Sequence, residues 1–214
     1  MFNEAMYIPA AFRETRLEVL QALIREHSFA TLISEVDGQP FATHMPFLLD
    51  PTRGPNGTLR GHMARANPHW RSFSEATVAL VTFQGPHAYI SPSWYLSEPA
   101  VPTWNYSAVH AYGTPTLLSE WHDVRKLLED TVNTFESGFA EQWSTARAGE
   151  DYIARLGQGI TAFEIPIDRL EGKRKLSQNR LSDIESAAAG LLAHGDATGR
   201  VVAEQMLEVA ASAH

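Results

Sequence analysis

Residues able to bind a ligand are concentrated in four segments where polar, His and aromatic side chains are mixed: residues 43–46, 61–70, 102–113 and 175–180. A phosphate group prefers Arg or Lys, hydroxyls, amides and a helix N-terminus, and each charge-assisted hydrogen bond contributes roughly 1.5–3 kcal/mol. Arg65, the helix start at Asn67 and the run 175–180 supply such groups. These groups could form a local anion site.

The same segments could also form the wall of a flat heterocycle. Such a ring needs apolar or aromatic contacts and a few donors and acceptors along its polar edge. The candidates are Thr43, His44, His62, Trp104, Asn105, Tyr106 and His110. On spacing alone, each segment also has a structural explanation: half-buried His residues, an Asn-Pro helix cap, tryptophans in the core, and a solvated loop at 172–180.

Several familiar catalytic sites are absent from the sequence. There is no Cys, which excludes disulfides, thiolate metal sites and a Cys nucleophile. There is also no GxGxxG, P-loop, GxSxG or HExxH motif. His44, His62 and His110 could bind a metal, or one of them could be an axial haem ligand, but no acidic residue accompanies them at a suitable spacing. No catalytic acid or base can be named, so enzyme status stays open.

Most of the elements that must position these residues are predicted strands. Residues 29–36 and 39–50, joined by Asp37-Gly38, predict a hairpin with Pro46 at an edge or bulge. Asn67-Pro68 predicts the start of a short helix through Phe73. Further strands are predicted at 58–65, 76–85 (buried on both faces at the sheet centre), twice within 85–119, and finally at 159–168.

The predicted helices lie at both ends of the chain and between the last strands. They cover residues 12–27, 121–135, 151–156, 183–194 and a terminal segment at 199–213. Their expected caps are Thr15 with Glu18, Ser119, and Ser182 with Glu185, while Gly195 and Gly199 are expected to bracket a turn. Together these elements predict a mainly β fold with helices (α+β), a small antiparallel barrel with helices packed around it.

Charge and hydropathy limit the partners. The net charge of -8 disfavours direct DNA binding, although Lys173, Arg174, Lys175 and Arg180 form a local cationic group. The C-terminal helical pair matches a helix-turn-helix only in length, because Arg200 is its one permanent cation. The sequence lacks an apolar run long enough for a membrane span and a signal-like N-terminal segment, so a cytoplasmic protein without a membrane partner is expected.

Five motifs occur in a family-specific order: HMPFLLD, GHMARANPHW, SPSWY, VPTWNY with VHAYG, and KLSQNR. Over about residues 1–182 this series resembles the PaiB-like family of FMN-binding negative transcriptional regulators. The resemblance implies a split β-barrel, similar to pyridoxamine-phosphate oxidases and flavin reductases, with FMN in a groove at a homodimer interface. Met45 and Met63 stand where Leu is often found, a volume-conserving difference.

The resemblance also implies a set of cofactor-binding residues. They are Thr43, His44, Met45, His62, Ala64, Arg65, Asn67, Trp70, Trp104, Asn105, Tyr106, His110, Lys175, Ser177, Gln178, Asn179 and Arg180. No metal ligand is included. Residues 1–180 are expected to form the barrel domain, and residues 181–214 a helical appendage packed on the barrel or on the dimer partner.

Two kinds of role follow from the resemblance. The chain would be a regulator that represses transcription, or a flavin-dependent oxidoreductase using a nicotinamide or another small-molecule electron donor. The alternatives are a haem-binding or haem-utilisation split barrel and a flavoenzyme like pyridoxamine-phosphate oxidase. A visible spectrum separates flavin from haem.

Overall fold

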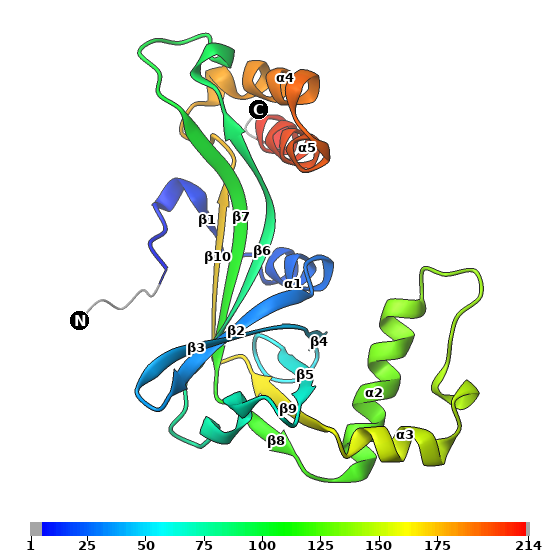
Figure 1. The fold of residues 1–214 in the computed structure, drawn as a ribbon. Helices are drawn as coiled ribbons and strands as arrows, with labels where there is room; N and C mark the ends of the chain where they lie inside the picture. The colour runs from blue at the N-terminus through cyan, green and yellow to red at the C-terminus, as the bar shows by residue number, and fades with distance from the viewer. Residues whose placement is uncertain (1–5, 213–214) are drawn as a thin grey trace. The chain divides into compact units, whose positions relative to one another are not determined.

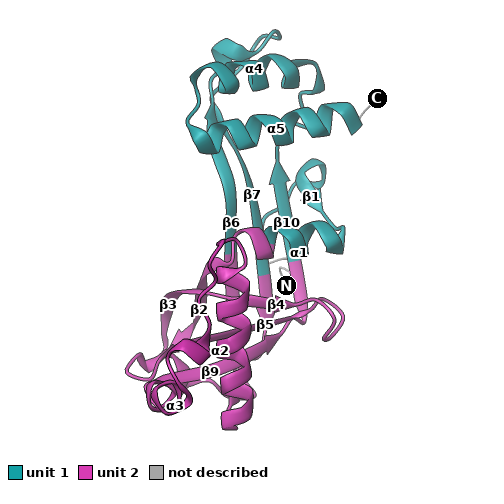
Figure 2. Cartoon of the chain, turned by 90° about the vertical axis from the view of Figure 1, so that its right-hand side faces the viewer, with its two compact units in different colours: residues 1–23, 83–110, 171–214 teal, residues 24–82, 111–170 magenta. Residues whose placement is uncertain are grey.

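The computed structural model describes residues 6–212, which form two compact units (Figure 2). Of the described residues, unit 1 contains 6–23, 83–110 and 171–212, and unit 2 contains 24–82 and 111–170. The long strands β6 (Ala79–Ile90) and β7 (Thr103–Gly113) contribute residues to both. Neither unit is therefore a continuous stretch of sequence, and the predicted division at residue 180 stays a prediction.

Unit 2 begins with the predicted hairpin. The strands β2 (Phe29–Val36) and β3 (Gln39–Pro46) pair antiparallel, and Asp37 and Gly38 between them have φ angles of 51° and 74°. Positive φ at both positions is what a tight two-residue hairpin turn requires. β6 pairs with the other side of β2, so β3 is an edge strand. Pro46 ends that edge strand, as predicted, where its missing N–H breaks no ladder.

A second, four-stranded sheet completes the β structure of unit 2. Its order is β4 (Leu48–Asp50), β5 (Thr58–Ala64), β9 (Ile160–Pro166) and β8 (Thr116–Leu118). Two helices, α2 (Trp121–Glu136) and α3 (Glu150–Gly157), belong to the same unit (Figure 2). They are labelled along the chain in Figure 1. The 3-10 helices η2 (Pro68–Ser72) and η4 (Thr145–Arg147) are also in this unit. The buried residues Leu48, Val124, Leu127 and Ala162 pack α2 onto this sheet.

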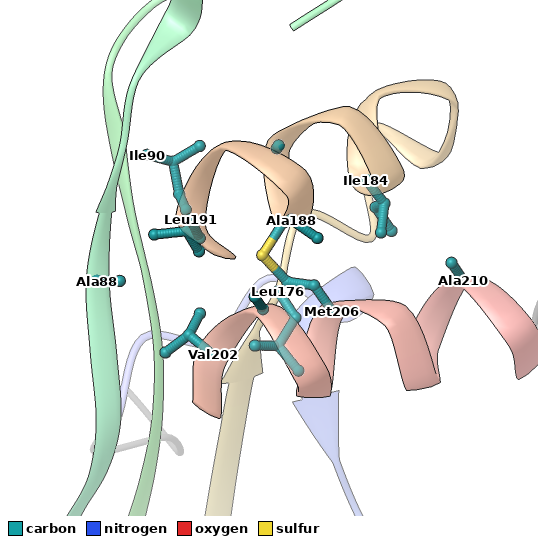
Figure 3. Close-up of a cluster of buried hydrophobic side chains, with 11 residues drawn as sticks. Ala88, Ile90, Leu176, Ile184, Ala188, Leu191, Val202, Met206 and Ala210 are labelled. Carbon is teal, nitrogen blue, oxygen red and sulfur yellow. The ribbon is translucent and has the colours of Figure 1, made fainter. Parts of the chain in front are cut away.

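In unit 1, the strand order is β1 (Arg13–Glu14), β10 (Arg169–Lys175), β7 and β6. Its helical elements are η1 (Ala10–Phe12), α1 (Leu17–Glu26, which continues into unit 2), η3 (Pro92–Trp94), η5 (Leu181–Asp183), α4 (Ile184–His194) and α5 (Ala197–Ser212). Figure 3 shows Met206 of α5 pointing toward α4, in a buried cluster that includes Ile90, Leu176 and Leu191. The last two helices thus share a core with strands of unit 1.

The strand predictions need two corrections. Residues 159–168 do not form the final strand, because β10 (Arg169–Lys175) follows and includes residues 172–175 of the loop predicted at 172–180. β6 extends to Ile90, beyond the predicted segment 76–85, and lies between β7 and β2, at the sheet centre as predicted. Within the predicted segment one face is buried at Ala79, Val81 and Phe83, but Leu80 and Thr82 on the other face are only half-buried, so full burial of both faces is corrected.

The helices themselves were predicted, but several of the residues at which they begin, and the expected caps, were not. α1 begins at Leu17, so residues 13–16 are not helical and Thr15 is not its cap. The N-cap residues of α2 and α4 are Glu120 and Asp183, neither with a side-chain capping bond, so the Ser119 and Ser182 caps are wrong. Gly199 lies inside α5 instead of ending a turn. Among residues 6–212, no helix combines the length and apolarity needed to cross a bilayer.

Candidate functional site

Polar residues from β2, β3 and η2 form a hydrogen-bonded network around His69 in unit 2. The ring is fully buried, and its Nδ1 and Nε2 lie 2.8 Å from Thr43 Oγ1 and 2.9 Å from Ser34 Oγ. Phe41 meets the imidazole edge-on at a centroid distance of 4.9 Å. Burial lowers the pKa of His69, so the ring is neutral near pH 7.

Asn67 connects this network to the start of η2. Its Oδ1 accepts from the His69 N–H at 3.0 Å, and its Nδ2 donates to Thr43 Oγ1 at 3.1 Å. Pro68 follows at the first helical position, where a missing N–H costs nothing. The predicted cap is confirmed, and both polar ends of Asn67, together with the Thr43 hydroxyl, are used inside the chain.

Arg65 directly follows β5, on a turn that several hydrogen bonds hold in place. Its N–H donates to Gly159 O at 2.9 Å, and its carbonyl accepts from Trp70 Nε1 at 3.0 Å. One guanidinium nitrogen, Nη2, donates to Ile160 O at 2.9 Å. Among the described residues no carboxylate pairs with Arg65, so an exposed guanidinium is held in place with donors left for an anion.

The remaining predicted residues of unit 2 differ in exposure. His44 is exposed, with Nδ1 2.9 Å from Thr31 Oγ1, whereas Met45 is only 4% exposed. A Cβ on Gly61 would lie 2.6 Å from Met45 Cε, so this buried side chain packs on the glycine. His62 is half-buried, and burial lowers its pKa. Ala64 is exposed and Trp70 half-buried.

In unit 1, three predicted residues hold the turn after β10. Asn105 is fully buried and its Nδ2 donates to Ser177 Oγ at 2.9 Å. Ser177 is also buried and has a φ of 68°, a conformation that favours Gly. Gln178 Oε1 accepts from Leu176 N at 2.7 Å, and its Nε2 donates to Arg174 O at 2.6 Å. Asn105 and Ser177 thus bond to each other and Gln178 bonds to the main chain of the turn, whereas Asn179 is exposed.

Arg180 is also engaged within unit 1. Its Nη1 donates to Ser97 Oγ at 3.1 Å and to Asp183 Oδ2 at 3.3 Å, and its Nη2 donates to Pro99 O at 3.0 Å. Asp183 is fully buried and accepts from the Leu96 and Ser97 N–H groups at 3.0 Å. The Ser97 hydroxyl bond, and then the bonds from backbone N–H groups and Arg180, hold the Asp183 pKa below its usual range.

Two lysines of β10 form the cationic part of unit 1. Lys173 Nζ donates to Tyr7 O at 3.1 Å and lies over the Tyr7 and Tyr106 rings. Lys175 donates to the Thr103 hydroxyl, and burial, then the neighbouring Lys173, lower its pKa. Within residues 6–212, neither ammonium is in an ion pair with a carboxylate. Lys175 therefore fits an anion.

Trp104 and His110 lie on β7 of unit 1. Trp104 is 52% exposed, and its ring lies 5.8 Å from that of His87 and 6.2 Å from that of Tyr89, centroid to centroid. His110 is half-buried; burial lowers its pKa while Glu171 acts in the opposite sense. In the described part of the chain, no three His, Asp or Glu side chains are grouped to bind a metal ion.

The structure thus gathers Thr43, Arg65, Asn67 and Trp70 around one turn of unit 2, and Asn105, Ser177 and Gln178 around one turn of unit 1. Sequence reasoning missed His69 and Ser34 of the first group and Asp183 beside Arg180. His69 lies inside the motif GHMARANPHW, two residues after the cap Asn67, and that position was the available signal.

Comparison with known proteins gives a family and relatives. A family model described as "Putative FMN-binding domain" matches residues 6–169. The Protease synthase and sporulation protein PAI 2 of Bacillus subtilis (strain 168) is 37% identical over 175 residues, which cover 82% of this chain and 83% of that protein. A protein of Emericella nidulans is 30% identical over 243 residues, covering 95% and 97% of the two chains.

Solved structures support the fold. A flavocytochrome from Azotobacter vinelandii superposes with a TM-score of 0.59 at 14% identity, covering 76% of this chain and 69% of that one. The FAD and haem binding protein from Mycobacterium smegmatis gives 0.55 at 19% identity, covering 76% and 73%. At such identities the likeness concerns the fold alone. The predicted fold class, antiparallel sheet with helices in a split barrel, is confirmed.

Proposed function

Because the chain belongs to the PaiB-like family of FMN-binding proteins, we propose that it holds the FMN phosphate at the turn after β5 in unit 2. One observation carries this proposal: Arg65 is exposed and anchored, and no carboxylate of the described residues neutralises it. A phosphate dianion would supply the missing charge and accept several N–H bonds. The donor set of this turn therefore fits the phosphate of the cofactor.

The neighbouring residues of unit 2 suit the rest of the cofactor. His44, His62 and Trp70 offer partly exposed rings, and Ala64 adds a small exposed side chain beside Arg65. Met45 is buried, so its contribution would come from its main chain. Thr43 and Asn67 use their side chains to fix the turn, so their proposed role is to position Arg65.

In unit 1 we assign Lys175 as a second anion ligand and Trp104, Tyr106 and His110 as ring contacts. Lys175 donates to the Thr103 hydroxyl and, among residues 6–212, is in no ion pair with a carboxylate. Ser177, Gln178 and Arg180 would act by shaping the turn after β10, because their polar groups are bonded within the chain. Asn105 donates to Ser177, but its buried Oδ1 has no hydrogen-bond partner among the described residues, so we assign it as an acceptor for the cofactor. Exposed Asn179 keeps its place as a proposed contact.

For the whole protein, we propose a cytoplasmic homodimer with FMN at the interface between the copies. When bound, FMN supplies hydride or single-electron transfer, while the protein supplies binding and orientation. The proposed role is regulatory, by transcriptional repression through a partner, or flavin-dependent redox chemistry with a nicotinamide or similar donor. The charge of -8 argues against direct DNA contact as the route to repression.

The visible spectrum of the purified chain is the first test. A yellow flavin spectrum whose chromophore is released on denaturation is expected, and a Soret band would instead favour the haem alternative.

FMN titration into the Arg65→Gln variant should then give a Kd raised roughly tenfold or more, since a charge-assisted bond contributes about 1.5–3 kcal/mol. Exposed Arg147 provides the matched control, Arg147→Gln.

The thermal midpoint without FMN should be nearly the same in Arg65→Gln and Arg147→Gln, because both side chains are exposed. An FMN affinity that is equal in the two variants would refute the phosphate role of Arg65.

A further inference from the structure

Unit 2 contains a pocket of about 520 Å³, between α2, α3, β8, β9 and the turn after β5. Ligand pockets usually have volumes of about 300–1,000 Å³, so a molecule of one or two fused rings could fill it. The walls are mostly apolar, with Trp70, Trp121, Leu117 and Ile160 among the largest side chains. Arg65 is the one charged residue among those that line it.

Some of the residues that line the pocket belong to the packed core of unit 2. Val124 and Ala162 of its lining belong to the buried cluster that joins α2 to the sheet. Gly157 of α3 allows the Trp121 indole to lie against the helix, because a Cβ there would be 2.4 Å from the ring. Trp121 and Leu117 nevertheless remain 39% and 40% exposed. Covering these apolar groups with a ligand removes them from water, which favours binding.

We propose that this pocket binds a second small molecule, an aromatic carboxylate. The indoles and aliphatic side chains match a flat apolar ring, and Arg65 matches a carboxylate through its planar donor fork. The lining contains no acidic residue that would repel the anion. The pocket proposal does not depend on FMN binding, but Arg65 and Trp70 are also assigned to the proposed flavin site. FMN and the carboxylate would therefore compete for Arg65, so 2-naphthoate is titrated into FMN-free chain.

Binding of 2-naphthoate to the full-length chain tests the proposal, with titration followed by calorimetry. The uncharged 2-naphthalenemethanol is the comparison, and it should bind at least tenfold more weakly because it lacks the charge that Arg65 recognises. The Ala154→Phe variant should also lower 2-naphthoate affinity at least tenfold, since Ala154 lines the pocket and a larger side chain takes up its volume. The exposed Ala189 of α4 gives the control Ala189→Phe.

FMN affinity is measured in the same variants. FMN affinity should be unchanged in Ala154→Phe and reduced in Arg65→Gln. A failure of the flavin site can therefore be told apart from a failure of the carboxylate pocket. Chain that binds 2-naphthoate but not FMN would refute the flavin site and leave the pocket standing.

The pocket proposal is overturned if 2-naphthoate does not bind, if the neutral alcohol binds equally well, or if Ala154→Phe binds 2-naphthoate like the parent chain. Should Ala154→Phe fail to fold, Leu117→Ala on the exposed rim replaces it, with a severalfold weaker 2-naphthoate affinity expected and an unchanged one refuting the proposal.

Discussion

His69 is bonded at both ring nitrogens to hydroxyl groups and has no exposed surface. A proton added to this ring would place a charge in a site that offers no carboxylate in the network described above, and burial accordingly lowers the pKa of His69. In the unfolded chain the ring titrates near its ordinary pKa of about 6.5. Below that pH the unfolded state therefore binds a proton that the folded state does not take up.

This difference predicts that the free energy of unfolding falls as the pH is lowered from 7 to 5. The expected slope approaches about 1.4 kcal/mol per pH unit for each excess proton. His62 and His110 also have pKa values lowered by burial and add to the slope. The His69→Gln variant should have a smaller slope, measured by urea unfolding at several pH values. An identical slope in the variant and the parent chain would contradict the argument.

Asp183 joins two elements of unit 1, η5 and the loop after η3. It accepts hydrogen bonds from two backbone N–H groups, from the Ser97 hydroxyl and from Arg180. Because these bonds lower the pKa of a fully buried carboxylate, the stability they supply is present above the unfolded pKa near 4. That stability is lost as the pH falls through the lower pKa of the folded state.

The Asp183→Asn substitution should lower the free energy of unfolding by about 2–4 kcal/mol at pH 7, because it removes the charge from a buried network. Urea denaturation measures the change. The exposed Asp151 of α3 provides the control Asp151→Asn, expected within about 0.5 kcal/mol of the parent chain. A loss for Asp183→Asn no larger than that of the control would show that the network adds no stability.

Strands β7 and β9 approach closely at Gly113. A Cβ there would lie 2.1 Å from Pro166 O and 2.7 Å from Ile165 Cγ2, and the carbonyl cannot move without moving its strand. Gly113→Ala should therefore destabilise the protein by about 1–3 kcal/mol or more, as overpacking does. Gly138→Ala is the control because nothing lies within 4 Å of its added Cβ. Equal thermal midpoints for the two variants would rule out the close approach.

Among the helices and strands, the sequence predicts those whose signal lies within a few neighbouring residues. The β2–β3 hairpin follows from Asp37-Gly38 between alternating residues, and the start of η2 follows from Asn67-Pro68. β10 was missed because its sequence RLEGKRK has no apolar alternation; pairing with β1 and β7 makes it a strand. Such pairing is a tertiary interaction that a local pattern does not contain.

The residues of the candidate site show the same difference between partners close in sequence and partners far apart in sequence. Asn67 was predicted as a cap and proved to be one, because its partner lies two residues away. Asn105 and Ser177 were predicted as ligands, yet each is bonded to the other across 72 residues of sequence. His69 has partners on two different strands, Ser34 and Thr43. Spacing alone cannot choose between these partners and a cofactor, since only the packing of the strands brings them together.

For the whole molecule, the proposed homodimer can be tested directly by measuring the mass of the protein in solution. Unit 1 exposes apolar side chains that a solvated surface does not favour, among them Val101 (71%) and Trp104 (52%). Residues of this kind are typical of the centre of protein interfaces. Light scattering after size exclusion should give about twice the chain mass of 23.7 kDa.

If FMN lies at the interface, its binding and dimer formation must support each other, because a ligand stabilises the form that binds it. Dilution of the protein should then weaken FMN binding, and added FMN should keep the dimer together at lower protein concentration. Fluorescence of released FMN, followed together with mass photometry over a dilution series, measures both. A monomer that binds FMN with the same Kd as the dimer would place the flavin within one chain and remove the interface from the proposed site.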